Sequence, residues 1–560
     1  MRSRIEWLGP ALILIHLGAS ACQSSSSTAP DASPGAPDAP SAPATQASSD
    51  VIRFLEQATF GPTDALADEV QSMGISAYLD AQLAAPATSL GSFPVVTQNV
   101  NQLCPQPGTP PSCRRDNFSA FPVTVQFYKN ALAAPDQLRQ RVAFALGQIL
   151  VVSGDEVPST YGIAAYQQLL VDDAFGNFRK LIEDVTLSPA MGRYLNMVNN
   201  DKPNAQKGTH PNENYARELM QLFTIGLVEL DPDGSTKMDG QGSPIATYDQ
   251  AEVSELARVF TGWTYPTAPE GSAKPHNPPY YLGAMIAVAA NHDTDKKTIL
   301  EGAVLPAGQT AEKDLADALD RIFQNPNVGP YIGRQLIQHL VVSNPSPAYV
   351  TRISAVFADD GHGVRGNLAA VVRAILLDPE ARGDSKTDPS YGKLREPTLL
   401  VTGVARAVGA ASDGVMLRNS SASLEQDVYN APSVFSFYPP DTPLPGSALV
   451  SPSGQIFDST TALNRPNYVY NLVYKGAPPD STVTGSTGTV ATLAALAGAA
   501  ADPAALVDRL DVLLMHRTLP ADMRQAIVDA VSSLPATDPT GRARMAAYLV
   551  GSSVQYQVER

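Results

Sequence analysis

The segment from residue 210 to residue 226 carries the densest group of side chains that could do chemistry. It reads His-Pro-Asn-Glu-Asn-Tyr-Ala-Arg-Glu-Leu-Met-Gln-Leu-Phe-Thr-Ile-Gly, and we call it the signature segment. A histidine near carboxylates can bind a divalent metal ion or transfer protons. His210, Glu213 and Glu218 are therefore the first candidates for a site.

The spacing inside the signature segment supports two interpretations. Glu213 and Arg217 are four residues apart, as are Asn214 and Glu218, so each pair can meet on one face of a helix. The commoner explanation is a solvated face on which each pair contributes roughly 0.2–0.5 kcal/mol. The functional alternative is a cleft in which Glu213 or Glu218 is the catalytic base or a metal ligand and Arg217 holds an anionic group. The spacing is not a known zinc pattern, because the second histidine of His-Glu-x-x-His is missing.

A two-faced helix would have to position these side chains. Pro211 suits the first helical position and Gly226 the residue just past the end, so we expect the helix over residues 211–225. At 100° per residue, one face is expected to be polar, with Glu213, Asn214, Arg217, Glu218, Gln221 and Thr224. The other face is expected to be buried, with Tyr215, Ala216, Leu219, Met220, Leu222, Phe223 and Leu227.

A second candidate lies at His292-Asp293. Neighbouring side chains diverge along a chain, so the ordinary interpretation is a turn aspartate beside an exposed histidine. Across the fold, however, His292 could reach a carboxylate of the signature segment, and a divalent metal would then have His210, His292 and Asp293 as ligands. His339 lies in an apolar stretch and is interpreted as a satisfied core or edge histidine.

Aromatic and amide side chains add candidate binding groups. Trp263, with Tyr280 and Tyr281, could form a platform that stacks on sugars, although a Thr-Gly-Trp turn at a helix end is more often a structural plug. Asn212 and Asn214 could bind a substrate or a partner. The sequence holds no Gly-x-Ser-x-Gly nucleophile motif and no glycine loop for phosphate or dinucleotide binding.

Composition limits the classes of protein that need to be considered. The chain has 560 residues, of which 44% are hydrophobic and 17% charged, as is typical of globular proteins with a substantial core. Its formal net charge of −16 predicts no nucleic-acid partner, because neutralising phosphates needs a basic surface.

The N-terminus predicts export and a lipid anchor. Residues 1–21 have the arginines, apolar run and small residues of a secretory signal, and Cys22 follows the small residues at once, as in a bacterial lipoprotein box. No aspartate follows Cys22, which favours an outer-membrane lipoprotein that faces the periplasm or the cell surface. Residues 22–49 are rich in Ser, Ala and Pro and are expected to form a disordered tether.

With Cys22 acylated, Cys104 and Cys113 remain as a pair in an oxidising compartment. A disulfide between them is the favoured interpretation, and two reduced thiols are the alternative. Both lie in a loop-rich insert at residues 86–121.

The periodicity of the remaining chain is helical, and strand signals are sparse. The predicted fold class is mainly α, a multi-helix globular core with long irregular loops and little strand. The core is expected over residues 50–478. A last helical group at 479–560 is either a C-terminal subdomain or part of the same core. Long loops at 264–310 and 409–458 are expected to shape a site.

Several motifs, together with the signature segment, resemble the family known as domain of unknown function 1800. They are Arg53 to Thr63, Tyr248 to Trp263, His292-Asp293 with Lys296 or Lys297, Lys393-Leu-Arg-Glu-Pro397, Pro432 to Tyr438, Tyr548-Leu-Val and Tyr556-Gln-Val. The resemblance covers roughly residues 50–560 and implies a secreted bacterial envelope protein with no agreed substrate. It also implies a possible partner, a secreted sulfatase-like protein of the domain of unknown function 1501 family.

Two functions from different classes remain open on these observations. The first is a binding or assembly role at the cell envelope, with the polar face of the signature helix as its site. The alternative is a metal-assisted envelope hydrolase that uses His210, Glu213, Glu218 and His292. Geometry separates the two, because the hydrolase needs these four side chains to converge in a pocket.

Overall fold

The computed structural model describes residues 44–383, 388 and 390–560. The predicted signal peptide, the predicted lipidation site Cys22 and most of the predicted tether lie outside the described residues. Helix α1 (Ala44–Ala58) begins before the predicted end of the tether, so residues 44–49 are helical. Their composition suggested a tether, but the side chain of Ser49 is buried and donates to the carbonyl of His516 over 2.7 Å.

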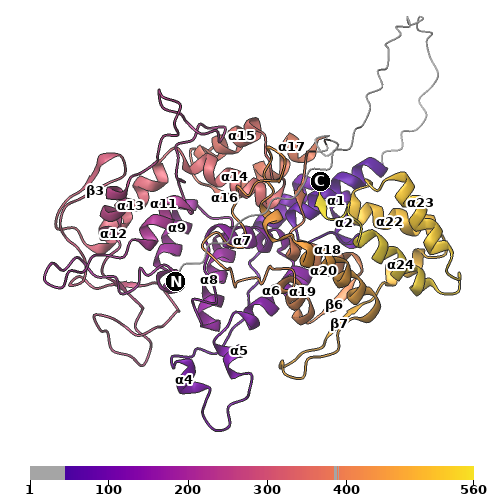
Figure 1. Cartoon of the computed structure of the whole chain (residues 1–560), viewed down its shortest axis with the longest axis horizontal. Helices are drawn as coiled ribbons and strands as arrows, with labels where there is room; N and C mark the ends of the chain where they lie inside the picture. Colours follow the sequence, from indigo (N-terminus) through magenta and orange to yellow (C-terminus); the bar gives the residue numbers. More distant parts are fainter. Residues whose placement is uncertain (1–43, 384–387, 389) are drawn as a thin grey trace, which may run out of the picture. The chain divides into compact units, whose positions relative to one another are not determined.

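The fold is mainly α, as the periodicity predicted (Figure 1). The first helices after α1 are α2 (Asp64–Met73), α3 (Ile75–Ala84), α4 (Val100–Leu103), α5 (Cys113–Asn117), α6 (Phe121–Ala133), α7 (Gln137–Ile149), α8 (Thr160–Asp173), α9 (Phe178–Leu187) and α10 (Pro189–Tyr194). The middle helices are α11 (Asn214–Gln221), α12 (Gln250–Val259), α13 (Ala311–Gln324), α14 (Val328–Leu340), α15 (Pro347–Ala358), α16 (Leu368–Leu377), α17 (Pro379–Arg382), α18 (Pro397–Ala407) and α19 (Val415–Ala422). The last are α20 (Ser459–Tyr470), α21 (Ala494–Ala499), α22 (Pro503–Met515), α23 (Ala521–Ser532) and α24 (Pro539–Gly551).

The strands are short and form antiparallel two-stranded sheets. The pairs are β1 (Trp263–Thr264) with β2 (Ile286–Ala287), β3 (Lys297–Ile299) with β4 (Ala303–Leu305), β5 (Lys393–Leu394) with β8 (Val558–Glu559), and β6 (Ala410–Ser412) with β7 (Thr489–Ala491). The β5–β8 pair joins the middle of the chain to its last residues.

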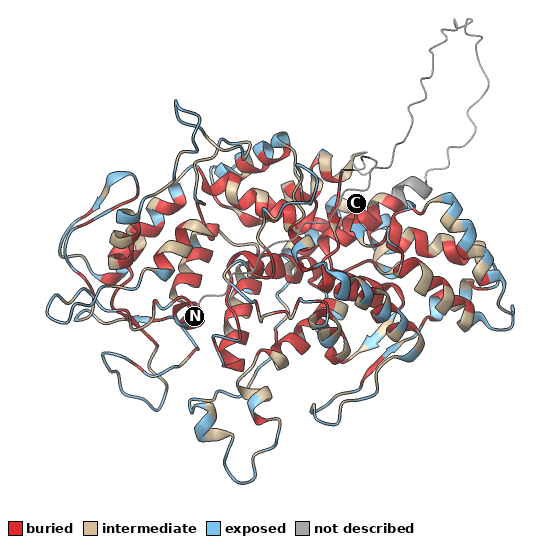
Figure 2. Ribbon diagram, viewed as in Figure 1, coloured by how far each residue is buried: buried red, intermediate tan, exposed pale blue. Residues whose placement is uncertain are grey.

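Residues 44–560 form one compact unit. The C-terminal helices bury Leu506, Leu510 and Val550 in the same apolar cluster that holds Phe54 of α1. The buried residues run through the centre of the molecule from one end to the other (Figure 2). The helical group at 479–560 is therefore part of the main core. No helix of the described residues is long and apolar enough to cross a membrane.

Helix α18 lies in the centre of this core, because all of its residues are buried. Pro397 occupies its first turn and Glu396 is its N-cap. Proline fits there because the first N–H groups of a helix have no intrahelical partner. The Lys393-Leu-Arg-Glu-Pro397 motif is thus the entry to the most buried helix of the fold.

The signature helix is shorter than its sequence pattern predicted. Helix α11 starts at Asn214, not at Pro211, because the Asn212 side chain accepts the Asn214 N–H and the Asn200 side chain holds the backbone of Asn212. It ends at Gln221, and residues up to the positive-φ Gly226 form wider turns.

The early end of α11 explains two errors in the predicted faces. Thr224 is fully buried and donates to the carbonyl of Leu219, whereas Leu227 is 57% exposed. Beyond Gln221 the 100° rule no longer applies, because the chain is no longer an α-helix. Tyr215, Leu219, Met220 and Phe223 are buried, as predicted.

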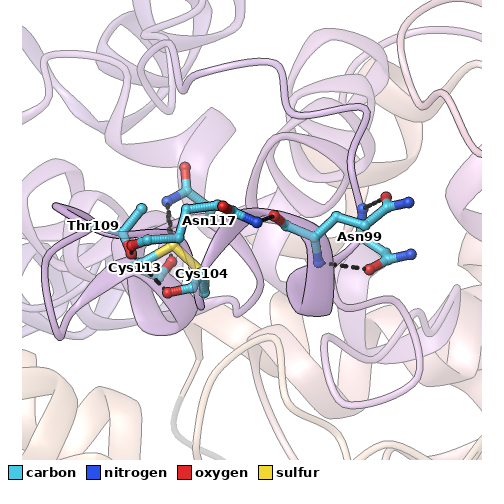
Figure 3. Close-up of a disulfide and its surroundings, with 7 residues drawn as sticks. Asn99, Cys104, Thr109, Cys113 and Asn117 are labelled. Atoms are coloured by element: carbon cyan, nitrogen blue, oxygen red, sulfur yellow. Dashed lines mark hydrogen bonds between the residues drawn. A yellow bond between two sulfur atoms is a disulfide. The ribbon is translucent and has the colours of Figure 1, made fainter.

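The predicted disulfide is present (Figure 3). Cys104 follows α4, Cys113 opens α5, and their Cα atoms are 5.6 Å apart. Asn99 caps α4, and Thr109 donates to the carbonyl of Cys104 over 2.7 Å. The insert at 86–121 therefore contains two short helices linked by the disulfide.

Candidate functional site

The polar face of the signature helix ties α11 to α12. The Glu213 carboxylate accepts hydrogen bonds from Ser254 (2.6 Å), Gln250 (2.9 Å) and Arg217 (3.0 Å). The Ser254 bond, together with those from Gln250 and Arg217, lowers the pKa of Glu213. About a third of each charged side chain is still exposed, so Glu213 and Arg217 form a surface ion pair between helices.

Glu218 has a different environment. Its Oε2 atom is buried and has no hydrogen-bond partner among the described residues, and burial raises the pKa of the carboxyl. Its charge acts on the phenols of Tyr194, Tyr248 and Tyr331. Of the two predicted carboxylates, Glu218 is thus the one withdrawn from solvent.

His292 belongs to a buried polar network. Its Nε2 lies 3.1 Å from the Asp314 carboxylate and its Nδ1 lies 3.0 Å from the carbonyl of Thr261. Asp314 also accepts from Lys297 (2.6 Å) and Gln309 (2.9 Å). The histidine is 1% exposed, so the expectation of an exposed loop histidine is wrong. Both of its ring nitrogens have partners within the fold.

Asp293 is engaged in the same region. Arg258 of α12 donates to its two carboxylate oxygens over 2.7 and 3.2 Å, and these bonds lower the pKa of Asp293 against the effect of burial. The His292-Asp293 pair and Lys297 therefore connect the loop and β3 to α12 and α13. These residues have a structural role, which the sequence alone could not distinguish from a metal-binding role.

The structure does not assemble the predicted metal ligands. His210 is exposed, whereas His292 and Asp293 are buried beside Asp314 and Arg258. Within the part of the chain that the structure describes, no group of three or more His, Cys, Asp or Glu side chains could hold a metal ion. His210, Glu213, Glu218 and His292, whose convergence the hydrolase alternative requires, therefore form no such group among these residues.

Trp263 is buried, 4% exposed, and cannot serve as an exposed platform. The preceding Gly262 has a φ of 85°, and a Cβ atom there would lie 2.8 Å from the Cβ of His292. The Thr-Gly-Trp turn is thus a plug against the His292 network. Asn212 and Asn214 are exposed, and Asn212 shapes the start of α11.

A small polar cavity lies where several motif segments meet. Its volume is about 50 Å³. It is lined by residues of α7 and α14, of β5 and the turn after it, and of the 434–440 loop. The polar lining residues include Gln148, Gln335, His339, Lys393, Glu396 and Tyr438. A polar cavity of this size can hold water or one small polar group. We call it the Glu396 cavity.

Glu396 is the central acceptor of the cavity. Its Oε2 accepts from Gln426 (2.8 Å), Tyr438 (2.9 Å) and Gln148 (3.2 Å). All these bonds from described residues reach Oε2, which leaves Oε1 for a ligand. Burial alone would raise the pKa of Glu396, but Lys393 and Arg141 outweigh it and lower the pKa. Its position at the N-terminus of α18 also favours the ionised form.

His339 contributes a neutral ring to the same cavity. Burial lowers its pKa to about 4, so the imidazole is uncharged near neutral pH. No described residue forms a hydrogen bond with its ring nitrogens, whereas its backbone carbonyl accepts from Arg141 (2.6 Å) and Lys393. His339 is half-buried, as an edge histidine would be, and its ring lines the cavity without a hydrogen bond from a described residue.

The signature segment reaches this cavity through its C-terminal end. Leu222 and Tyr331 line the cavity, and the Tyr331 hydroxyl donates to the carbonyl of Gln221 over 2.8 Å. A Cβ atom on Gly226 would lie 2.8 Å from the Tyr331 ring, so the glycine permits this contact. The segment therefore helps to build the site mainly through packing.

The residues around Glu396 were not among the predicted site residues. Lys393, Glu396 and Tyr438 lie in segments that were noted only for their family resemblance. A usable signal was present, because Lys393-Leu-Arg-Glu-Pro397 places three charged residues directly before the apolar run of α18. Charged residues are almost never fully buried unless they are paired.

The fold and the cavity define a class: a mainly helical protein in which buried charged residues at a helix entry form a small polar site. The family model of the protein of unknown function DUF1800 matches residues 53–558, and the chain belongs to that family. No curated protein and no solved structure shows a significant match to the chain.

The two polar networks should respond differently to mutation. Asp314→Asn should lower the free energy of unfolding by roughly 3–5 kcal/mol, because it leaves buried Lys297 without its carboxylate. Glu213→Gln is the control and should cost less than about 1 kcal/mol, since its ion pair is partly exposed. Urea unfolding of both variants measures the difference. Similar losses in the two variants would contradict a structural role for the buried network around Asp314.

The depressed pKa of His339 gives stability a specific pH dependence. Its folded-state pKa is about 4 and its ordinary value 6.5, so the unfolded chain binds the extra proton first as the pH falls. Between pH 6.5 and 4 the wild type should lose on the order of 3 kcal/mol that His339→Gln does not lose. Urea unfolding across this range measures the loss, and parallel curves for the two proteins would contradict it.

Proposed function

We propose that the protein has a binding role at the cell envelope, with the Glu396 cavity as its ligand site. The observation that carries this proposal is the arrangement of Glu396 and His339. A carboxylate held on one oxygen by three donors, and a neutral imidazole without a partner, face the same small cavity. Neither Glu396 Oε1 nor the His339 ring receives a hydrogen bond from a described residue, so both can accept one from a ligand in the cavity.

The chemistry of the lining defines the kind of group that fits. Glu396 Oε1 and the His339 ring can accept hydrogen bonds, and the buried Nε2 of Gln335, which has no partner among the described residues, can donate one. A hydroxyl or an amide can both donate and accept a hydrogen bond. Tight fixation of Glu396 by Gln148, Gln426 and Tyr438 favours recognition, because it keeps the acceptor in one orientation.

The envelope location rests on the N-terminal sequence. We propose that the chain is exported, is acylated at Cys22, and is anchored in the outer membrane on the periplasmic or outer side. An oxidising compartment is consistent with the Cys104–Cys113 disulfide. A secreted protein of the domain of unknown function 1501 family remains a proposed partner on family resemblance.

The test is native mass spectrometry of the protein purified from the membranes of its own cells. The wild type should carry a noncovalent species that Glu396→Gln lacks, since the amide can turn a donor into the cavity where the carboxylate offered an acceptor. Glu213→Gln makes the same chemical change outside the cavity and should retain the species. A wild type without any bound species, or an equal load on Glu396→Gln, would contradict the proposal.

A further inference from the structure

The Glu396 cavity adjoins a much larger groove. The groove has a volume of about 650 Å³ and shares Ser343, Lys393 and Leu394 with the cavity. Ligand pockets have volumes of roughly 300–1,000 Å³, so the groove is large enough for a small organic molecule. The two spaces meet at β5.

The walls of the groove are mainly apolar. Leu444 and Phe457 are each 40% exposed and Val558 is 36% exposed, although exposed large apolar side chains are normally scattered singly. Phe435, 40% exposed, lines the adjoining cavity. Exposed apolar side chains from residues 435–457 and from the C-terminal strand β8 thus gather around the groove and the adjoining cavity.

Two of the polar side chains along the groove, those of Asn344 and Thr442, have their hydrogen bonds within the fold. Asn344 donates to the carbonyl and accepts from the N–H of Val450, each over 2.8 Å. Thr442 donates to the carbonyl of Pro439 over 2.9 Å. A peptide needs regularly spaced partners for its backbone, but these side chains have their hydrogen bonds within the fold. An alkyl chain needs none.

The cavity end presents several polar atoms to which a head group could bind. There, Glu396 Oε1, the His339 ring and Gln335 Nε2 lack partners among the described residues. Glu396 and Lys393, residues of opposite formal charge, both line the cavity, and the His339 imidazole is neutral. A head group with a net charge would meet one attractive and one repulsive neighbour, so an uncharged head group fits best.

We propose that the ligand of this site is a single-chain amphiphile, with its alkyl chain in the groove and an uncharged hydroxyl- or amide-bearing head in the Glu396 cavity. This inference rests on the proposed function and names the chemical class of its ligand. Binding requires no covalent step. The apolar contact area supplies the affinity, and the head group fixes the orientation.

The probe is 1-decanoylglycerol below its critical micelle concentration, titrated into the mature protein by calorimetry. Saturable binding with one molecule per chain is expected, and glycerol alone should give no measurable heat. Decanoate and decylammonium should each bind at least about tenfold more weakly, a difference of about 1.4 kcal/mol. Equal affinity for the neutral, anionic and cationic probes would overturn the head-group assignment.

Two exposed leucines provide the matched variants. Leu444→Asp places a charge in the groove and should weaken binding of 1-decanoylglycerol at least about tenfold, with an unchanged melting temperature. Leu463→Asp makes the same change at a 68% exposed residue outside the groove and should bind as the wild type does. Unaltered binding by Leu444→Asp would overturn the groove assignment.

The two proposals can fail separately. If native mass spectrometry finds a bound species that depends on Glu396 but 1-decanoylglycerol does not bind, the amphiphile inference is wrong and the binding role stands. If the probe binds equally well to the wild type and to Glu396→Gln, the groove is used without the cavity, and the inference is again wrong. If neither experiment detects a ligand, both proposals fall.

Discussion

The buried ion pair between Arg395 and Glu56 is the interaction on which the rest of the structure depends. Arg395 is 3% exposed, and its Nη2 lies 3.2 Å from both oxygens of Glu56 in α1. Its Nε donates to the carbonyl of Tyr556 over 3.1 Å, and its backbone carbonyl accepts from Arg465 over 2.9 Å. One guanidinium therefore connects the first helix, the centre and the end of the chain.

The same constraint builds the proposed site. Arg395 lies between Lys393 and Glu396, and its backbone N–H donates to the carbonyl of Gln557 over 2.7 Å, which continues the β5–β8 pairing. Because Arg395 is fixed in the core, its neighbours Lys393 and Glu396 are also buried. Burial would raise the pKa of Glu56, but Arg395 and His516 lower it, so the pair is charged inside the core. The C-terminus accordingly lies beside α1 (Figure 1).

How much the sequence predicts follows from the range of each interaction. Local patterns predicted the mainly helical class, the buried side of α11 and the disulfide, because these depend on periodicity and on short separations. The bounds of α11 could not be predicted, since its start depends on Asn200 and its end on the distant Tyr331. His292 was a candidate ligand because its partner Asp314 comes from helix α13, a contact that the local sequence does not reveal.

The site itself was beyond local reasoning for the same reason. Glu396, His339 and Tyr438 are far apart in sequence and meet only in the folded chain. The signature segment has a high density of polar residues, yet its ion pair between Glu213 and Arg217 lies at the surface. The buried charges of Lys393-Leu-Arg-Glu-Pro397 are fewer, but each needs a partner from a remote segment. In this chain, charged residues that must be buried thus indicate the site better than a high density of polar residues does.

A double-mutant cycle on Glu56→Gln and Arg395→Gln tests this account most directly, with the free energy of unfolding as the measured quantity. Each single variant removes the Arg395–Glu56 partner from one buried charge and should cost roughly 3–5 kcal/mol. The double variant should cost clearly less than the sum, with a coupling energy of about 2 kcal/mol or more. Additivity within about 0.5 kcal/mol would contradict the account, because it would mean that the two side chains do not depend on each other.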